Sequence, residues 1–184
     1  VRIKMEKETK YDIVIFGATG FTGEMTAKYL AGRMKEEPFR LGIAGRDEIK
    51  LAALKKALVT INPSCAEVGL VRADVKDYAS LLKMTKETKL VITTVGPYLK
   101  YGDPVVKACV EGGADYLDLT GEGGFVNHVT NFYDKKAKEN KVKILNCCGF
   151  DSIPADLGTY FTVKQLPANE PIEVECFVSF SSSN

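Results

Sequence analysis

The sequence of 184 residues has one histidine, His128, and no C-x-x-C pair among its five cysteines. One histidine excludes a three-histidine metal site, and in the stretch FVNHVTNFY it is more typical of a helix surface than of a metal ligand. An odd number of cysteines, set mostly in apolar runs, favours a reducing compartment and buried thiols over a disulfide framework. The cysteines are Cys65, Cys109, Cys147, Cys148 and Cys176.

Long apolar runs and an excess of one charge are also missing. No run reaches the roughly 20 apolar residues that a membrane-spanning helix needs, and the first ten residues, VRIKMEKETK, are too charged for a secretory signal. The formal net charge is +1, with basic and acidic residues interspersed, so nothing indicates a nucleic-acid or anionic membrane surface. We expect a soluble chain that is not secreted, binds no nucleic acid and contains no membrane segment.

What the sequence does contain is an alternation of short, β-branched runs with longer segments of helical period. Continuous apolar strands indicate burial on both faces, and short connections indicate right-handed βαβ crossovers. The pattern predicts an α/β fold with a doubly wound parallel sheet, the Rossmann fold. The expected strands are 12–17, 40–46, 66–74, 89–96, 114–120 and 142–148, and the expected helices are 22–36, 47–58, 77–87, 102–113, 123–141 and 154–166.

Two of these helices carry local start signals. Asp47 is well placed to cap the helix in which Leu51, Leu54 and Leu58 share one face. Asp103, followed by Pro104, predicts a helix that begins there, because proline favours the first helical position.

The last segment, IEVECFVSFSSS at 172–183, alternates apolar and mostly polar residues, as a strand with one wet face does. We expect it to be the first strand of a truncated second α+β domain; an antiparallel edge strand on the main sheet is the alternative. The predicted domains are a dinucleotide-binding domain at 10–166 and the start of an incomplete substrate domain at 167–184.

Three glycines, Gly17, Gly20 and Gly23, lie between the first strand and the first helix. The spacing G-x-x-G-x-x-G is looser by one residue than the dinucleotide fingerprint. Even so, one glycine allows a sharp turn, one allows close approach of a ligand, and one allows the helix to pack on the strand. A helix N-terminus there offers N–H groups to a pyrophosphate, so we predict cofactor binding by this turn, which also contains Thr19, Phe21 and Thr22.

The ends of the next strands indicate which cofactor. Arg46 is the first charged side chain after the second strand, where an arginine accommodates a 2′-phosphate, so NADP is favoured over NAD. Asp74 ends the third strand, near where adenine would lie, although a turn-forming aspartate is an open alternative. Gly96 and Pro97, at the end of the fourth strand, predict a rigid loop beside the nicotinamide; Tyr98 and Tyr101 in the same region suit loop packing.

With these motifs in view, the chain resembles the saccharopine dehydrogenase-like oxidoreductase family from Tyr11 to Gly158. The resemblance is carried by GATGFTG, AGRD, VGPY, YGDPVVKAC, GADYLDLTGE and GFDSIPADLG. The chain is similar more distantly to true saccharopine reductases and to the trans-acting enoyl reductases of bacterial lipid synthesis. The resemblance implies the cofactor-binding part of a longer protein, with Gly17, Gly20, Gly23 and Arg46 holding the cofactor and Gly96, Pro97 and Tyr98 on its nicotinamide side.

The function that follows is an NAD(P)-dependent oxidoreductase that transfers a hydride to or from an imine, carbonyl or enoyl carbon. The alternatives are a non-catalytic NADP(H)-binding sensor or scaffold and an enoyl reductase of lipid metabolism. The expected partner is a small-molecule substrate, and a homodimer is a candidate assembly. We expect a cytoplasmic location, or one at an organelle or lipid surface through the rest of the protein, and an isolated fragment that is inactive. No catalytic residue is assigned. Asp151 and Ser152 would end the sixth strand facing the cleft, although an aspartate before a helix that starts with proline is more often a cap or a turn.

Overall fold

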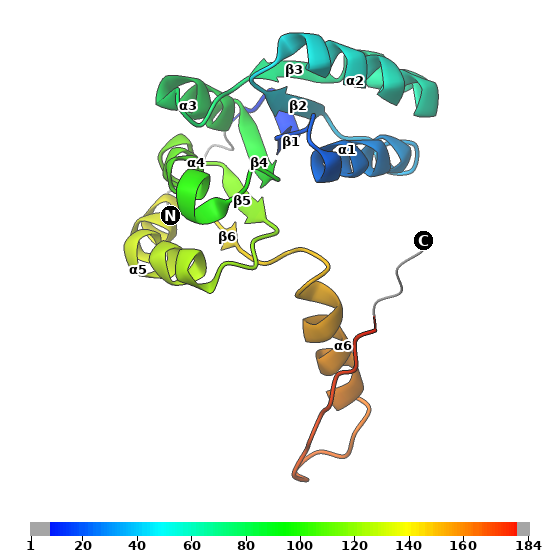
Figure 1. The fold of residues 1–184 in the computed structure, drawn as a ribbon, viewed down its shortest axis with the longest axis vertical. Helices are drawn as coiled ribbons and strands as arrows, with labels where there is room; N and C mark the ends of the chain where they lie inside the picture. The colour runs from blue at the N-terminus through cyan, green and yellow to red at the C-terminus, as the bar shows by residue number, and fades with distance from the viewer. Residues whose placement is uncertain (1–7, 180–184) are drawn as a thin grey trace.

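The computed structural model describes residues 8–179, which form a six-stranded sheet with helices on both faces (Figure 1). All pairs in the sheet are parallel, and the strand order is β3-β2-β1-β4-β5-β6. This is the order of a Rossmann fold, in which the order of the strands reverses between β1 and β4. The predicted fold class is therefore confirmed.

The bounds of the elements lie within a few residues of most of the predicted ones. The strands are β1 (Tyr11–Phe16), β2 (Leu41–Gly45), β3 (Gly69–Arg72), β4 (Thr88–Thr93), β5 (Asp115–Asp118) and β6 (Ile144–Leu145). The helices are α1 (Phe21–Arg33), α2 (Glu48–Ile61), α3 (Tyr78–Lys86), α4 (Tyr98–Gly112), α5 (Gly123–Asn140) and α6 (Ile153–Val163), with a short 3-10 helix, η1 (Pro63–Glu67), after α2.

The alternation of side chains along β1 divides the core in two. Val14 and Phe16 pack on the face that α3, α4 and α5 cover, whereas Ile15 packs on the face that α1 and α2 cover. Figure 1 shows these two groups of helices on opposite sides of the sheet. Because both faces are covered, the central strands are largely apolar beyond their amino ends, where Asp12 and Lys89 lie, which explains the apolar runs in the sequence.

The predicted cap of α2 is confirmed. The Oδ1 atom of Asp47 accepts a hydrogen bond of 3.0 Å from the backbone N–H of Lys50, and Leu51, Leu54 and Leu58 are buried.

The predicted start of α4 at Asp103 and Pro104 is wrong, because the helix begins at Tyr98 and contains Pro104 in its interior. Asp103 does not cap a helix. Its Oδ1 atom lies 2.6 Å from Nε2 of His128 and accepts a hydrogen bond of 2.8 Å from the hydroxyl of Tyr133, both on α5. His128 is thus a hydrogen-bonded helix residue.

The last described segment differs from the sheet domain. Within residues 8–179, α6 has no buried side chain, and Figure 1 shows it leading away from the sheet. Residues 171–179 form no strand, so the predicted strand is wrong over 172–179, and its remainder lies outside the described residues. A strand needs a partner for its backbone N–H and C=O groups, and this segment pairs with none in the described chain.

The predicted burial of the thiols holds for Cys65 and Cys109, which lie in the two cores. It is wrong for Cys176, which is exposed in the segment after α6. Within the described residues, no helix is both long and apolar enough to cross a lipid bilayer.

Candidate functional site

A cleft of about 350 Å³ lies at the carboxyl ends of the first four strands. Its walls come from the loops that follow β1, β2, β3 and β4, together with Tyr101 from the first turn of α4. In open α/β sheets ligands bind outside the carboxyl ends of the strands, where the strand order reverses. The cleft spans that point, because β1 and β4 are the adjacent strands at the reversal.

The loop after β1 has the shape that two of its glycines were predicted to give it. Gly17 has a φ of +86°, and a Cβ there would lie 2.7 Å from Cγ2 of Val95. A Cβ on Gly23 would lie 2.2 Å from the carbonyl oxygen of Gly17. A side chain fits at neither position, so the sharp turn and the close packing of α1 both require glycine.

Gly20 is different, because nothing in the chain itself requires it to be glycine. Its φ of −83° and ψ of 166° suit any residue, and a Cβ would lie no closer than 3.4 Å to another heavy atom of the chain. Gly20 is exposed and lines the cleft. The room left by the missing side chain is therefore room for something that enters the cleft.

Among helices α1 to α4, which follow the loops of the cleft, α1 is the one whose N-terminus can receive an anion. Helices α2, α3 and α4 begin with backbone N–H groups that donate hydrogen bonds to a carboxylate, that of Asp47, Asp77 and Glu122 respectively. In the described chain no side chain caps α1, whose cap residue is Gly20. Unpaired N–H groups and the positive end of the helix dipole bind phosphate, so α1 is where a pyrophosphate fits.

The loops after β2 and β3 place charged side chains at one end of the cleft. Arg46 is exposed and directly follows Gly45, the last residue of β2, and Lys76 lies four residues after β3. Asp74 lines the cleft and also makes a turn, because its Oδ1 atom accepts a hydrogen bond of 2.9 Å from the N–H of Lys76. This end of the cleft has two cations, which suits a phosphate ester.

The loop after β4 forms the other end of the cleft. Gly96 lines it, the Gly96–Pro97 peptide bond is cis, and α4 starts at the next residue. Tyr98 points into the core: it is 6% exposed, its hydroxyl donates a 3.0 Å hydrogen bond to the carbonyl of Thr93, and burial raises its pKa to about 12. Tyr101 is the tyrosine that lines the cleft.

The predicted site residues fall into two groups. The cleft is lined by Gly17, Thr19, Gly20, Arg46, Asp74 and Gly96. Phe21, Thr22, Gly23, Pro97 and Tyr98 are not among the residues that line it: Gly23 and Tyr98 are buried, and Phe21 is 84% exposed on α1. Lys76 was not predicted, and Tyr101 was expected only to pack in the loop. The available signal for Lys76 was its place in the loop after β3, two residues beyond Asp74.

Asp151 and Ser152 were expected to face the same cleft, and this is wrong. Asp151 lines a separate hollow beside α6, together with Pro154 and Phe177, and Ser152 is the first flanking residue of α6. The reason is the direction of the chain after β6, which leads away from the sheet (Figure 1).

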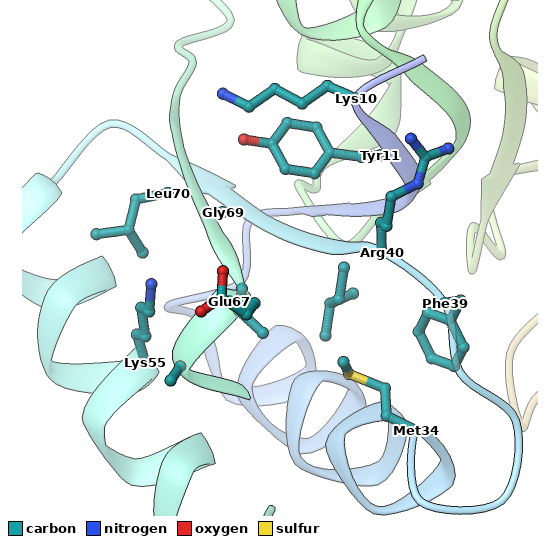
Figure 2. Close-up of a pocket in the computed structure, with 12 residues that line it drawn as sticks. Lys10, Tyr11, Met34, Phe39, Arg40, Lys55, Glu67, Gly69 and Leu70 are labelled. Carbon is teal, nitrogen blue, oxygen red and sulfur yellow. The ribbon is translucent and has the colours of Figure 1, made fainter. Parts of the chain in front are cut away.

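A second hollow, of about 500 Å³, lies at the amino ends of β1, β2 and β3 (Figure 2). Its lining mixes apolar and charged side chains: Phe39 and Met34 lie below Arg40, and Lys55 and Glu67 reach toward its interior from α2 and η1. Arg40 is already paired with Asp12 at 3.0 Å. This hollow has no glycine turn and no helix N-terminus in its lining, so it lacks the features that make the first cleft a phosphate site.

Fold and cleft together define a dinucleotide-binding domain. The residues 13–145 match the family model described as the saccharopine dehydrogenase NADP binding domain, and the chain belongs to that family. Its cofactor is accordingly NADP, as the sequence predicted.

Two relatives of the chain are longer proteins that are named as oxidoreductases. The "Probable mitochondrial saccharopine dehydrogenase-like oxidoreductase" of Arabidopsis thaliana is 38% identical over 95% of this chain and 40% of its own length. The "Trans-acting enoyl reductase" of Mycobacterium tuberculosis is 41% identical over 83% of this chain and 35% of its own. The enoyl reductases were expected to be the more distant relatives, and these identities show that this expectation is wrong.

A solved structure supports the fold. Apo saccharopine dehydrogenase (L-Glu forming) from Saccharomyces cerevisiae superposes with a TM-score of 0.67 at 17% identity, covering 84% of this chain and 31% of that one. The chain thus spans well under half the length of these three proteins.

Proposed function

We propose that this chain is the NADP-binding part of an oxidoreductase that moves a hydride between the nicotinamide and an imine, carbonyl or enoyl carbon. The observation that carries the proposal is the uncapped N-terminus of α1 beside the open position of Gly20, at the carboxyl edge of the sheet. The bound cofactor supplies the hydride chemistry, and the residues of this chain bind and orient it.

The binding arrangement follows from the two ends of the cleft. The turn from Gly17 to Gly20 and the first N–H groups of α1 hold the pyrophosphate. Arg46, assisted by Lys76, holds the 2′-phosphate, and Asp74 lies on the adenine side. Gly96 and Tyr101 bound the nicotinamide side, where the close backbone of Gly96 leaves room for the ring and for a substrate above it.

We further propose that the substrate contacts come largely from a second domain that begins after the sheet. The support is the apolar surface of α6, whose Leu157, Tyr160 and Phe161 are 54%, 60% and 67% exposed in the described chain. Apolar residues gathered on one helix indicate a packing partner. On this proposal residues 1–184 bind NADPH but turn over no substrate.

The similarity to an enoyl reductase at 41% identity favours an enoyl thioester as one candidate substrate class beside amino-acid imines. A homodimer stays a prediction. So does the location, in the cytoplasm or at an organelle or lipid surface; the name of the plant relative gives a mitochondrial location for that protein.

Arg46→Ala tests the arrangement. A charge-assisted hydrogen bond from the guanidinium to the 2′-phosphate contributes roughly 1.5 to 3 kcal/mol, or about ten- to a hundredfold in affinity. Calorimetric titration should show that loss for NADPH and almost none for NADH, which has no 2′-phosphate. An equal loss of affinity for both cofactors would mean that Arg46 contacts the pyrophosphate or stabilises the fold, and does not bind the 2′-phosphate.

A further inference from the structure

Glu122 connects the loop after β5 to the loop that bounds the nicotinamide side of the cleft. Its Oε1 atom accepts a hydrogen bond of 2.6 Å from the N–H of Tyr98, and its Oε2 atom accepts one of 2.9 Å from the N–H of Leu99. These are the first two residues of α4. The residue that precedes the helix is Pro97, which has no side-chain group to cap it. The cap of α4 therefore comes from a residue far along the chain.

Glu122 is itself held in place from two sides. Its N–H donates a 3.0 Å hydrogen bond to Oγ1 of Thr120, and its carbonyl accepts one of 2.8 Å from the N–H of Phe125 at the start of α5. Thr120 is buried, and its N–H donates to Oδ1 of Asp118 at 3.1 Å.

Asp118 extends the same network to the loop after β6. It is fully buried at the end of β5, and its carboxylate also accepts hydrogen bonds from Nδ2 of Asn146 at 2.7 Å and from the N–H of Cys147 at 3.0 Å. The two carboxylates thus tie together the three loops that follow β4, β5 and β6.

The charge on Glu122 has a second effect. A carboxylate at a helix N-terminus offsets the positive end of the helix dipole and uses the N–H groups that would otherwise bind an anion. The start of α4 is therefore closed to phosphate, while the start of α1 stays open. Of these two helix starts, only that of α1 is open to the pyrophosphate, and the uncharged loop at Gly96 is left for the nicotinamide half.

We infer that Glu122 is a positioning residue that fixes the loop Val95 to Pro97 so that it receives the nicotinamide half of NADP. The inference rests on the proposed function, because it takes the Gly96 side of the cleft as the nicotinamide side. Without the carboxylate, the first N–H groups of α4 turn to water, and binding of the whole cofactor must order the loop again.

The experiment separates the two halves of the cofactor. NADPH and adenosine 2′,5′-bisphosphate, which lacks the nicotinamide half, are titrated by calorimetry into the 184-residue chain and its variants. For Glu122→Ala we expect NADPH to bind about five- to tenfold more weakly, because part of its binding free energy must order the loop. The bisphosphate should bind within about twofold of its affinity for wild type. Glu122→Gln retains one acceptor oxygen and should restore part of the NADPH affinity.

Asp12→Ala is the matched control. Asp12 is also a carboxylate that accepts a backbone N–H, that of Arg40 at 2.9 Å, but it lies at the amino end of β1. Its removal costs stability and should leave both affinities unchanged.

The outcomes are distinct. An equal loss for both ligands in the Glu122 variants, or no loss for NADPH, overturns the inference and leaves the proposed function standing. If Glu122→Ala does not fold, Glu122→Gln is the test. It should weaken NADPH binding more than it weakens binding of the bisphosphate, and an equal loss for the two ligands would overturn the inference. A wild-type chain that binds neither ligand overturns the proposed function, and the inference with it.

Discussion

The carbonyl oxygen of Gly17 occupies the space that a side chain on Gly23 would need, 2.2 Å from the position of its Cβ. The two glycines therefore fix how closely α1 approaches the end of β1. This contact belongs to the fold, whereas the third glycine of the turn, Gly20, faces the cleft. The three positions make separate predictions for stability and for binding.

Gly23→Ala should destabilise the chain by about 2 kcal/mol or more, because the new methyl group meets backbone atoms that cannot move without shifting α1. Urea denaturation followed by far-UV circular dichroism measures this. Gly32→Ala on the same helix is the control: a Cβ there meets nothing within 4 Å, and the change should stabilise by up to about 1 kcal/mol. Equal stability of Gly23→Ala and wild type would contradict the packing described.

Gly20→Ala should change stability by at most about 1 kcal/mol, since alanine is only a poorer cap residue than glycine. We expect NADPH affinity to fall about tenfold or more, which corresponds to about 1.4 kcal/mol, because the methyl group occupies the space of the pyrophosphate. Calorimetric titration measures the affinity, with Gly32→Ala again expected to match wild type. If Gly20→Ala binds NADPH normally, the open space at Gly20 does not receive the cofactor.

Features of the fold that depend on neighbouring residues could be predicted from the sequence. The alternation of strands and helices predicted the parallel sheet, and Asp47, three residues before Lys50, predicted the cap of α2. The start of α4 could not be predicted, because its cap is Glu122, which lies 24 residues after Tyr98. Asp103 and Pro104 carried a valid local signal, but the tertiary contacts of Asp103 with α5 outweighed it.

The cleft shows the same division between local and long-range causes. The glycine turn and Arg46 were readable because each follows a strand directly, and strand ends meet at one edge of a parallel sheet. Tyr101 and Tyr98 are three residues apart and look alike in sequence. Only the packing of α4, with the Tyr98 ring 5.8 Å from that of Phe125, shows which one enters the core.

Lys76 should add to the discrimination between cofactors. Because its side chain is exposed, we expect Lys76→Ala to weaken NADPH only about two- to fivefold and to leave NADH unchanged. The effect should shrink as salt is added, since exposed charges are screened. Lys83→Ala, which removes an exposed lysine from α3 outside the cleft, is the charge-matched control. An equal loss of affinity for NADPH and NADH would show that Lys76 does not contact the 2′-phosphate.

The contacts of the Asp12 carboxylate make the stability of the fold depend on pH. Its carboxylate accepts hydrogen bonds from Arg40 at 2.9 to 3.1 Å and lies 2.8 Å from Nζ of Lys89. These contacts, the Arg40 hydrogen bond first, hold the pKa of Asp12 well below its ordinary value of 3.8. The unfolded chain therefore binds this proton at a higher pH than the folded chain does. The stabilisation from Asp12 is complete above the ordinary value and is lost as the pH falls from about 5 through the lower, folded pKa.

Asp12→Asn should accordingly lower the free energy of unfolding at pH 7 by about 1 kcal/mol, because the group is only partly shielded from solvent. The difference between variant and wild type should then shrink between pH 5 and pH 3, where wild type loses the same contribution. Urea denaturation at pH 7, 5, 4 and 3 measures both effects. Asp134→Asn breaks an exposed pair with Lys138 on α5 and should cost no more than about 0.5 kcal/mol at pH 7. A difference for Asp12→Asn that stays constant down to pH 3, or grows, would show that its ion pairs do not stabilise the fold through the charge of the carboxylate.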